Sequence, residues 1–497
     1  MLNRHVIHAI PPRELKEAFV SNLNGTSLVE VALGSFLSPL CLIHRGLILI
    51  LCHHLLHLHP MTPLLLDFFV IILPLVLSCT VLSSVLHVVI ITMTLVAAGL
   101  FYNIYTNSKH QRSTSSFIQS GVHFHQVPFI TLFRVFVNIN TAISILAVDF
   151  NVFPRRYAKT ETYGTGVMDF GVGGFVFANA LVSPEARGKN TSGLRINHIW
   201  KQLLSVWPLM ALGIGRLMTV KMTGYHEHET EYGVHWNFFF TLAIVRIVSS
   251  MLLTVLPANR SWVFASVICG LYQLTLETSS LKDFVIHNND RDKSFLLANK
   301  EGIISTVGYV AIYLIGVQVG LYVMQPRSRV REWLRALLTL LLTSFMLYAV
   351  LCTCQTFVEP VSRRLANLPF CLWSVAQSVF LMSCLGLADM IVLFCQRMSG
   401  CHFLTSSCTL QRKESETNTD LDQQTSKMER HGLIQAISRN QLFFFLLSNV
   451  LTGLTNSTID TLHCGSLFSV FVLLFYMLIN CFFIYVLHSY DITVKFW

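Results

Sequence analysis

Charged residues gather where an apolar stretch of the sequence, 128–148, comes to an end. Asp149 follows this stretch directly. Four further ionisable residues come next: Arg155, Arg156, Lys159 and Glu161. Partial burial at the edge of a bilayer makes a carboxylate a better base, while a nearby cation has the opposite effect. A carboxylate beside a cation can accept a proton from an alcohol and stabilise negative charge that develops during a reaction. An ion-pair cluster that only anchors a helix end would contain the same residues, and the spacing leaves both interpretations open.

Three other segments place polar side chains beside apolar stretches, namely 19–31, 225–237 and 281–309. A residue such as Lys300 at the boundary of an apolar stretch would also be expected as a simple interfacial anchor. The residues that we predict to bind substrate, besides Arg155, Arg156 and Glu161, are Asn22, Asn24, His235, Asn237, Lys300 and Glu301.

The segment 225–237 also contains a His-x-His pair, His226 and His228, which could bind a metal. The spacing fixes no third ligand, so we predict no metal site. The histidine-rich run 53–59 is expected to be a loop or a helix end. The motifs G-x-G-x-x-G, P-loop, G-x-S-x-G and H-E-x-x-H are absent, which argues against nucleotide hydrolases, serine hydrolases and zinc proteases.

The composition indicates what must surround these polar segments. Hydrophobic residues make up 53% of the 497 residues and charged residues only 12%. A soluble domain contains about 25% charged residues, so a lipid bilayer is the expected solvent of this chain. The net charge of +9 is compatible with contacts to anionic lipid head groups. The sequence has no basic helix and no RNA-binding motif, and no nucleic acid partner is expected.

A membrane-spanning helix needs roughly 20 mostly apolar residues. The sequence predicts an all-α polytopic membrane protein with about thirteen such helices. We expect one domain over 1–497, with the polar stretch 399–439 as a flexible cytoplasmic loop within it. The predicted spans are 28–51, 64–81, 83–105, 128–148, 166–184, 199–219, 234–256, 261–277, 303–324, 333–352, 369–395, 441–457 and 466–489.

Alternation of the spans across the bilayer places all four polar segments on one side. The loops on the other side, such as 106–127, 185–198 and 325–332, carry Lys and Arg with few acidic residues. The positive-inside rule therefore makes that other side cytoplasmic, and it predicts that the polar segments form a lumenal site. Two N-x-S/T sequons, at Asn24 and Asn456, fall on the predicted lumenal side but close to a span.

The same polar segments resemble the inositol acyltransferase family of glycosylphosphatidylinositol (GPI) anchor biosynthesis, called phosphatidylinositol-glycan biosynthesis class W in animals. The matching stretches run in family order over nearly the whole chain, and together they are far more specific than any single motif. They are KEAFVSNLNGTSLVEV (16–31), the stretch from DFNVFPRRYAK to FANALVS (149–183), HETEYGVHWNFFFTLA (228–243), NKEGIISTVGYVAIYLIG (299–316) and FFFLLSNVLTGLTNSTIDT (443–461).

The resemblance implies an enzyme of the endoplasmic reticulum membrane that moves an acyl chain from acyl-CoA, typically palmitoyl-CoA, to the inositol 2-hydroxyl of glucosaminyl-phosphatidylinositol. No permanently bound cofactor is implied. Asp149 and Lys159 match the family's important acidic and basic residues. Asp149 would accept the proton of the inositol hydroxyl, and Lys159 would orient Asp149 or offset charge on the thioester oxygen. Arg155 and Arg156 would hold the substrate phosphate, and the glycine-rich stretch 171–174 would admit the acyl chain.

Three other functions are compatible with the composition. A lipid transporter or flippase of the same pathway would have similar spans, although the sequence shows no paired broken helices. A membrane-bound O-acyltransferase of the histidine-dependent class would place a His deep in a span, and His87 and His235 are candidates. A partner protein without activity is the third possibility.

Overall fold

The computed structural model describes residues 19, 21, 23–52, 61–108, 114–124, 127–188, 195–223, 229–288, 290–399, 408–410 and 432–494. The predicted substrate-binding residue Asn22, the histidine-rich run 53–59 and the pair His226 and His228 lie outside these ranges. Most of the predicted loop 399–439 also lies outside them.

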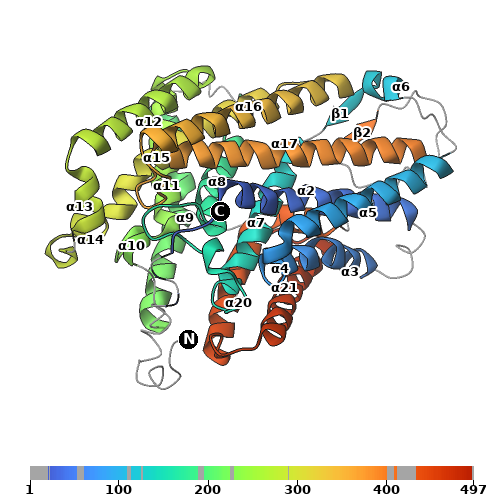
Figure 1. Ribbon diagram of the computed structural model, residues 1–497. Helices are drawn as coiled ribbons and strands as arrows, with labels where there is room; N and C mark the ends of the chain where they lie inside the picture. Colours follow the sequence, from blue (N-terminus) through green and yellow to red (C-terminus); the bar gives the residue numbers. More distant parts are fainter. Residues whose placement is uncertain are drawn as a thin grey trace.

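The described chain consists mainly of helices joined by loops, with one short pair of strands (Figure 1). Strand β1 (Val122–Phe124) pairs antiparallel with β2 (Cys408–Leu410), with Val122 opposite Leu410. The α-helices are α2 (Leu28–Leu51), α3 (Thr62–Asp67), α4 (Leu73–Cys79), α5 (Leu86–Asn107), α6 (Thr114–Gln119), α7 (Pro128–Ala147), α8 (Val167–Leu181), α9 (Arg195–Thr223), α10 (Glu229–Tyr232), α11 (Phe238–Val255), α12 (Ser261–Thr278), α13 (Leu281–His287), α14 (Phe295–Ala298), α15 (Lys300–Val323), α16 (Val330–Phe357), α17 (Leu368–Ser399), α19 (Leu433–Arg439), α20 (Gln441–Thr458) and α21 (Ser466–Ser489).

The predicted all-α polytopic architecture is confirmed. Each predicted span coincides with one helix or, for 64–81, with the run α3, the π-helical turn Phe68–Ile72 and α4. Among the described residues, nine helices or helix runs are long and apolar enough to cross a membrane, and α8 and part of α9 form shorter apolar helices. The number thirteen therefore stays a prediction.

Helix α17 forms the centre of the bundle, where it contacts α2, α7, α8, α15 and α16 (Figure 1). Most of its side chains are buried. Helix α5 lies at the periphery and exposes apolar side chains such as Ile91 and Leu95. An apolar face of this kind is unfavourable in water, which agrees with a bilayer around the bundle.

Small residues bring α15 close to α8. A Cβ atom added at Gly316 would lie 2.6 Å from the Cβ of Ala180, and one added at Gly320 would lie 2.8 Å from the Cβ of Ala186. Close approach of helix backbones through small residues is the usual packing mode inside membranes. This contact fixes α8, which carries one wall of the site described below.

The predicted loop 399–439 is too long at its C-terminal end. Leu433–Arg439 forms helix α19, in which Leu433, Ile434, Ala436 and Ile437 are buried. The backbone N–H of Leu433 donates to Asp67 Oδ2 at 2.9 Å, and Asp67 forms a buried ion pair with Arg45 at 2.6 Å. This short helix was not predicted because it directly follows the long polar stretch 399–431.

Candidate active site

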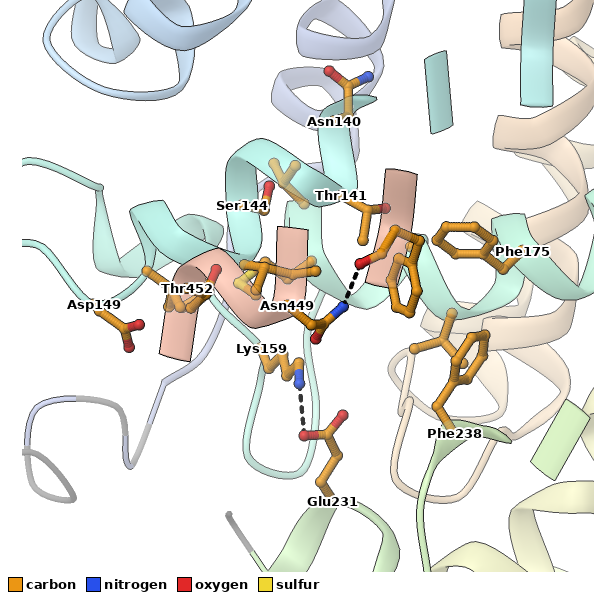
Figure 2. A pocket seen from close by; sticks show the side chains of 18 of the residues that line it. Asn140, Thr141, Ser144, Asp149, Lys159, Phe175, Glu231, Phe238, Asn449 and Thr452 are labelled. Carbon is orange, nitrogen blue, oxygen red and sulfur yellow. Dashed lines mark hydrogen bonds and ion pairs between the residues drawn. The ribbon is translucent and has the colours of Figure 1, made fainter. Parts of the chain in front are cut away.

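A cavity with a volume of about 1300 Å³ lies between α2, α4, α7, α8, α9 and α20, next to the loop 149–166 (Figure 2). Pockets for drug-sized molecules measure about 300–1,000 Å³, so this cavity has room for more than one small substrate. Its lining combines apolar side chains with charged and amide side chains. Of the predicted site residues, the described lining includes Asp149, Lys159 and Asn237.

Asp149 stands just beyond the C-cap of α7, Val148. Asn456, in the last turn of α20, donates from its side-chain nitrogen to Asp149 Oδ2 at 2.7 Å. Two distant parts of the chain therefore hold this carboxylate at the cavity wall.

Lys159 is held by a chain of alternating charges. Its Nζ donates to Glu231 Oε2 at 2.6 Å, and Glu231 Oε1 lies 3.6 Å from Arg363 Nη1. Arg363 Nε donates to Asp169 Oδ1 at 2.7 Å. Burial raises the pKa of the Glu231 carboxyl, but the charges of Lys159 and Arg363 outweigh this effect and lower it to about 2. The ionised Glu231 thus fixes Lys159 at the cavity (Figure 2).

Asp169 anchors the loop that carries Lys159. Its side chain is fully buried and accepts hydrogen bonds from the backbone N–H of Thr160 at 3.1 Å, the Thr160 hydroxyl at 2.9 Å and the Gly166 N–H at 3.0 Å. Together with Arg363 these donors compensate the buried charge. Removal of one partner from such a group leaves an uncompensated charge and is strongly destabilising.

Two roles were predicted for Lys159, to orient Asp149 or to offset charge on the thioester oxygen. Lys159 forms its ion pair with Glu231, and Asp149 accepts from Asn456. Of the two roles, the effect on charge at the thioester oxygen fits this arrangement better. Lys159 lines the cavity, and Glu231 rather than Asp149 is the carboxylate that holds its ammonium group.

Arg155 is engaged by the protein itself. Its guanidinium donates to the carbonyls of Val148, Phe150 and Phe153 at 2.9 Å each and stacks over the Phe19 ring at 3.9 Å. Burial lowers the pKa of Arg155 to about 10, against the opposing effect of the Asp149 charge. These bonds cap the end of α7 and shape the loop, so they compete with the predicted role in binding a phosphate.

Arg156 pairs with Glu30 at 3.0 Å, and the Tyr157 hydroxyl donates to the same carboxylate oxygen at 2.7 Å. Glu30 and Tyr157 line the cavity, whereas Arg156 does not. Its side chain keeps 41% of its surface exposed. Arg156 is therefore placed to hold Glu30 in position from behind the cavity wall.

Among four other predicted substrate-binding residues, Asn237 lines the cavity and has structural contacts. The amide oxygen of Asn237 accepts from the N–H groups of Phe239 and Phe240 and caps α11, and its nitrogen donates to the Gly213 carbonyl. The other three lie outside the described lining of the cavity: Asn24, Glu161 and His235.

Lys300 and Glu301 belong to a separate network at the start of α15. Glu301 is fully buried between Arg291 at 2.8 Å and Arg364 at 3.0 Å. Lys300 donates to the carbonyls of Phe284 and Asn288. Neither residue lines the cavity. These bonds fix the loop 279–299 onto the bundle, which is a structural use of both side chains.

The glycine-rich stretch 171–174 contributes less to the cavity than expected. Gly171 lines it, and a Cβ added there would lie 3.7 Å from the Thr141 hydroxyl. Gly173 and Gly174 are absent from the described lining. A side chain at Gly173 would run into Ser374 of α17, so this glycine serves helix packing.

Several lining residues were not predicted individually. Inside α7 and α20, polar side chains recur every three or four residues and so face one direction: Asn140, Thr141, Ser144, Asn449, Thr452 and Asn456. This spacing within otherwise apolar helices is a signal that could have revealed them. Arg363 had no such signal, because it lies in a short polar loop between two spans.

The loops predicted to share one side of the membrane contact one another. Lys282 pairs with Glu359 at 2.8 Å, and the Tyr163 hydroxyl donates to the same carboxylate at 3.4 Å. Ser362 donates to the Thr162 carbonyl at 2.6 Å. The structure therefore places these three loops at one end of the bundle; their lumenal location stays a prediction.

The part of the chain that the structure describes contains no group of three or more His, Cys, Asp or Glu side chains that could hold a metal ion. His226 and His228 are outside the described residues, so the expectation of no metal site stays a prediction.

The apolar helices and the large, partly charged cavity between them define a polytopic helical membrane protein with room for a sizeable substrate. Within this class, the chain belongs to the GWT1 family, whose model matches residues 12–487.

Relatives from several kingdoms match over nearly the full length. The chain is 45% identical to glucosaminyl-phosphatidylinositol-acyltransferase PIGW of Bos taurus, over 98% of this chain and 99% of that protein. It is 44% identical to the protein of the same name from Homo sapiens, with the same coverage. It is 31% identical to GPI-anchored wall transfer protein 1 of Candida albicans, over 94% of this chain and 95% of that protein.

Proposed function

We propose that this protein transfers an acyl chain from acyl-CoA to the inositol 2-hydroxyl of glucosaminyl-phosphatidylinositol in the endoplasmic reticulum membrane. The mammalian relatives that match it over almost their whole length are glucosaminyl-phosphatidylinositol-acyltransferases by name, which supports the acyltransferase activity and the acceptor. Palmitoyl-CoA is the proposed donor.

The reaction follows from the groups that line the cavity. Asp149 accepts the proton of the inositol hydroxyl, whose oxygen attacks the thioester carbonyl. A new C–O ester bond forms, the C–S bond breaks, and the CoA thiolate leaves and takes up a proton. Asn456 orients Asp149 through its 2.7 Å hydrogen bond. General-base assistance of this kind contributes about 10²–10⁴-fold.

Lys159 stabilises the negative charge on the carbonyl oxygen as the carbon becomes tetrahedral. Glu231 holds the ammonium group in place before the reaction begins. A preorganised donor directed at a developing oxyanion is worth about 10²–10³-fold. The observation that carries this proposal is the presence of a base and a cation on the walls of one lipid-sized cavity.

The test is acylation of glucosaminyl-phosphatidylinositol by the purified full-length protein with radiolabelled palmitoyl-CoA. We expect Asp149→Asn and Lys159→Ala each to lower kcat by about 100-fold or more. Near-normal turnover in either variant would remove that residue from the mechanism. Lipid movement across vesicles without acyl transfer would instead identify a flippase.

Matched controls are available on the surface. Asp290 and Lys293 form an ion pair in which both side chains are more than half exposed. Such pairs contribute little to stability. Asp290→Asn and Lys293→Ala make the same substitutions as Asp149→Asn and Lys159→Ala, but at residues away from the cavity. Both control variants are expected to keep normal activity.

A further inference from the structure

Four phenylalanine rings in mutual contact line the cavity. They come from α8, α11 and α20: Phe175, Phe238, Phe239 and Phe445. Phe175 contacts Phe238 at 5.9 Å and Phe445 at 5.7 Å between ring centroids, and Phe239 contacts Phe445 at 6.1 Å. These pairs have edge-to-face geometry, the favourable arrangement for aromatic rings. We call this group the aromatic wall.

The aromatic wall lies away from Asp149. Figure 2 shows Asp149 on one side of the cavity and Phe175 with Phe238 on the other, with Lys159 and Asn449 between them in this view. A chain that starts at the reacting groups and follows the cavity away from Asp149 therefore reaches these rings.

Polar groups next to the aromatic wall are bonded within the protein. The Trp236 indole N–H donates to the Thr241 hydroxyl at 2.9 Å, and the Asn237 side chain caps α11. The Asn449 side-chain nitrogen donates to the Phe445 carbonyl at 2.7 Å. This end of the cavity thus offers mainly hydrocarbon contacts, which suit a fatty acyl chain better than an inositol or sugar group.

The rings are also held firmly enough to form a boundary. Phe239 and Phe445 are 5% and 9% exposed. Each ring of the wall packs against at least one ring from another helix, so no single side chain can turn aside alone without losing those contacts. For an acyl chain that enters the cavity and extends toward the aromatic wall, these rings would limit how far it can reach, whereas the tails of a lipid acceptor can remain in the bilayer.

We propose that the aromatic wall is the stop for the acyl chain of the donor and sets its preferred length. This inference rests on the proposed acyltransferase function. It assigns a specificity-determining role to Phe175, which contacts two other members of the wall, and to Phe445, which contacts rings from both α8 and α11.

The experiment is a competition between saturated acyl-CoAs of different length in one reaction with a fixed acceptor, with products separated by mass spectrometry. Phe175→Ala opens the wall and is expected to shift the product ratio toward longer chains by about 10-fold, and Phe175→Trp is expected to shift it toward shorter chains. The ratio does not depend on how much protein is folded, so a loss of stability alone cannot produce these opposite shifts.

Phe177→Ala is the matched control. Phe177 also lies on α8 and is fully buried, but it packs edge-to-face on Phe133 at 6.0 Å and does not line the cavity. Its removal should lower stability and leave the length ratio unchanged. A second arm varies the tail length of the acceptor at fixed palmitoyl-CoA and should show no difference between Phe175→Ala and the unsubstituted protein.

Three outcomes would overturn the inference. An unchanged ratio in both Phe175→Ala and Phe445→Ala would do so, as would an equal shift in Phe177→Ala. If the Phe175→Ala variant changed the preference for acceptor tail length and not the preference for donor chain length, the aromatic wall would bind the acceptor instead. In all three cases the unsubstituted protein still acylates its acceptor. No transfer from any acyl-CoA by that protein would instead remove the proposed function, and the inference with it.

Discussion

At the scale of single residues, Glu231 connects two parts of the site. It binds Lys159 on the cavity side and lies beside Arg363 on the buried side. Since Arg363 is itself bound to Asp169, the position of the lysine depends on charges contributed by three separate segments. Lys159 can therefore be displaced by a change at a residue that need not touch the substrate.

Glu231→Gln keeps the shape of the side chain and removes its charge. We expect kcat to fall by about 100-fold with little change in the KM for acyl-CoA, because a displacement of about 1 Å at a reacting group has an effect of this size. Glu231→Asp should recover part of the loss. The measurement is steady-state acylation, and Glu277→Gln, at a 42% exposed carboxylate that lies 3.6 Å from Lys282, is the control. Normal kcat in Glu231→Gln would show that Lys159 is positioned without it.

The pH dependence of this contact follows from its lowered pKa of about 2. Because the pKa of Glu231 is lower in the folded protein than in the unfolded chain, its ionised form stabilises the fold at any pH above the ordinary pKa of a glutamate. This contribution is lost as the pH falls toward 2. Mild acid will therefore not reproduce the effect of Glu231→Gln.

Asp149 and Lys159 could be found in the sequence because they follow a long apolar run, where any charge stands out. Glu231 was harder to select, since the segment 225–237 contains other acidic residues and only packing decides which of them meets Lys159. Arg155 shows another limit of the sequence. Its charge suggested a phosphate ligand, and no local pattern indicated that its guanidinium would donate to three carbonyls near the end of α7. Its role in phosphate binding stays a prediction.

At the scale of helices, the approach of α15 to α8 depends on the absence of side chains. Gly316→Val would place methyl groups against Ala180 and the Phe177 carbonyl. Overpacking of this kind costs about 1–3 kcal/mol, so we expect a lower midpoint of thermal unfolding in detergent and reduced activity through displacement of α8.

Gly99→Val is the matched substitution on α5, where no atom lies within 4 Å of an added Cβ. It should leave thermal unfolding nearly unchanged. Equal destabilisation by both variants would mean that helix propensity, and not the α8–α15 contact, determines the effect.

The helices themselves were predictable because each needs a long apolar run, and the sequence contains these runs with clear polar breaks. Helix α19 was missed because seven residues beside a long polar stretch carry too little periodicity. The sequence also could not predict that Lys300 and Glu301 lie away from the cavity. The segment 279–299 packs onto α15 through hydrogen bonds and ion pairs, and no local sequence pattern connects the residues that form them.

At the scale of the whole molecule, the contacts among the loops 149–166, 279–299 and 358–367 place the site at one end of the bundle. The positive-inside rule predicts that this end faces the lumen. We expect a glycosylation tag inserted beside the exposed residue Lys293 to be modified in microsomes and one inserted at 411–420 to remain unmodified. The reverse pattern would place the site on the cytoplasmic face.

The hydrogen bond between Asn456 and Asp149 has a consequence for processing in the secretory pathway. Asn456 opens an Asn-Ser-Thr triplet, and its amide nitrogen, the atom to which an oligosaccharide would be attached, is the atom that holds the proposed base. A sugar at this position would break the contact and fill the mouth of the cavity. The active protein should therefore be the form in which α20 folds before the sugar-transferring machinery reaches it.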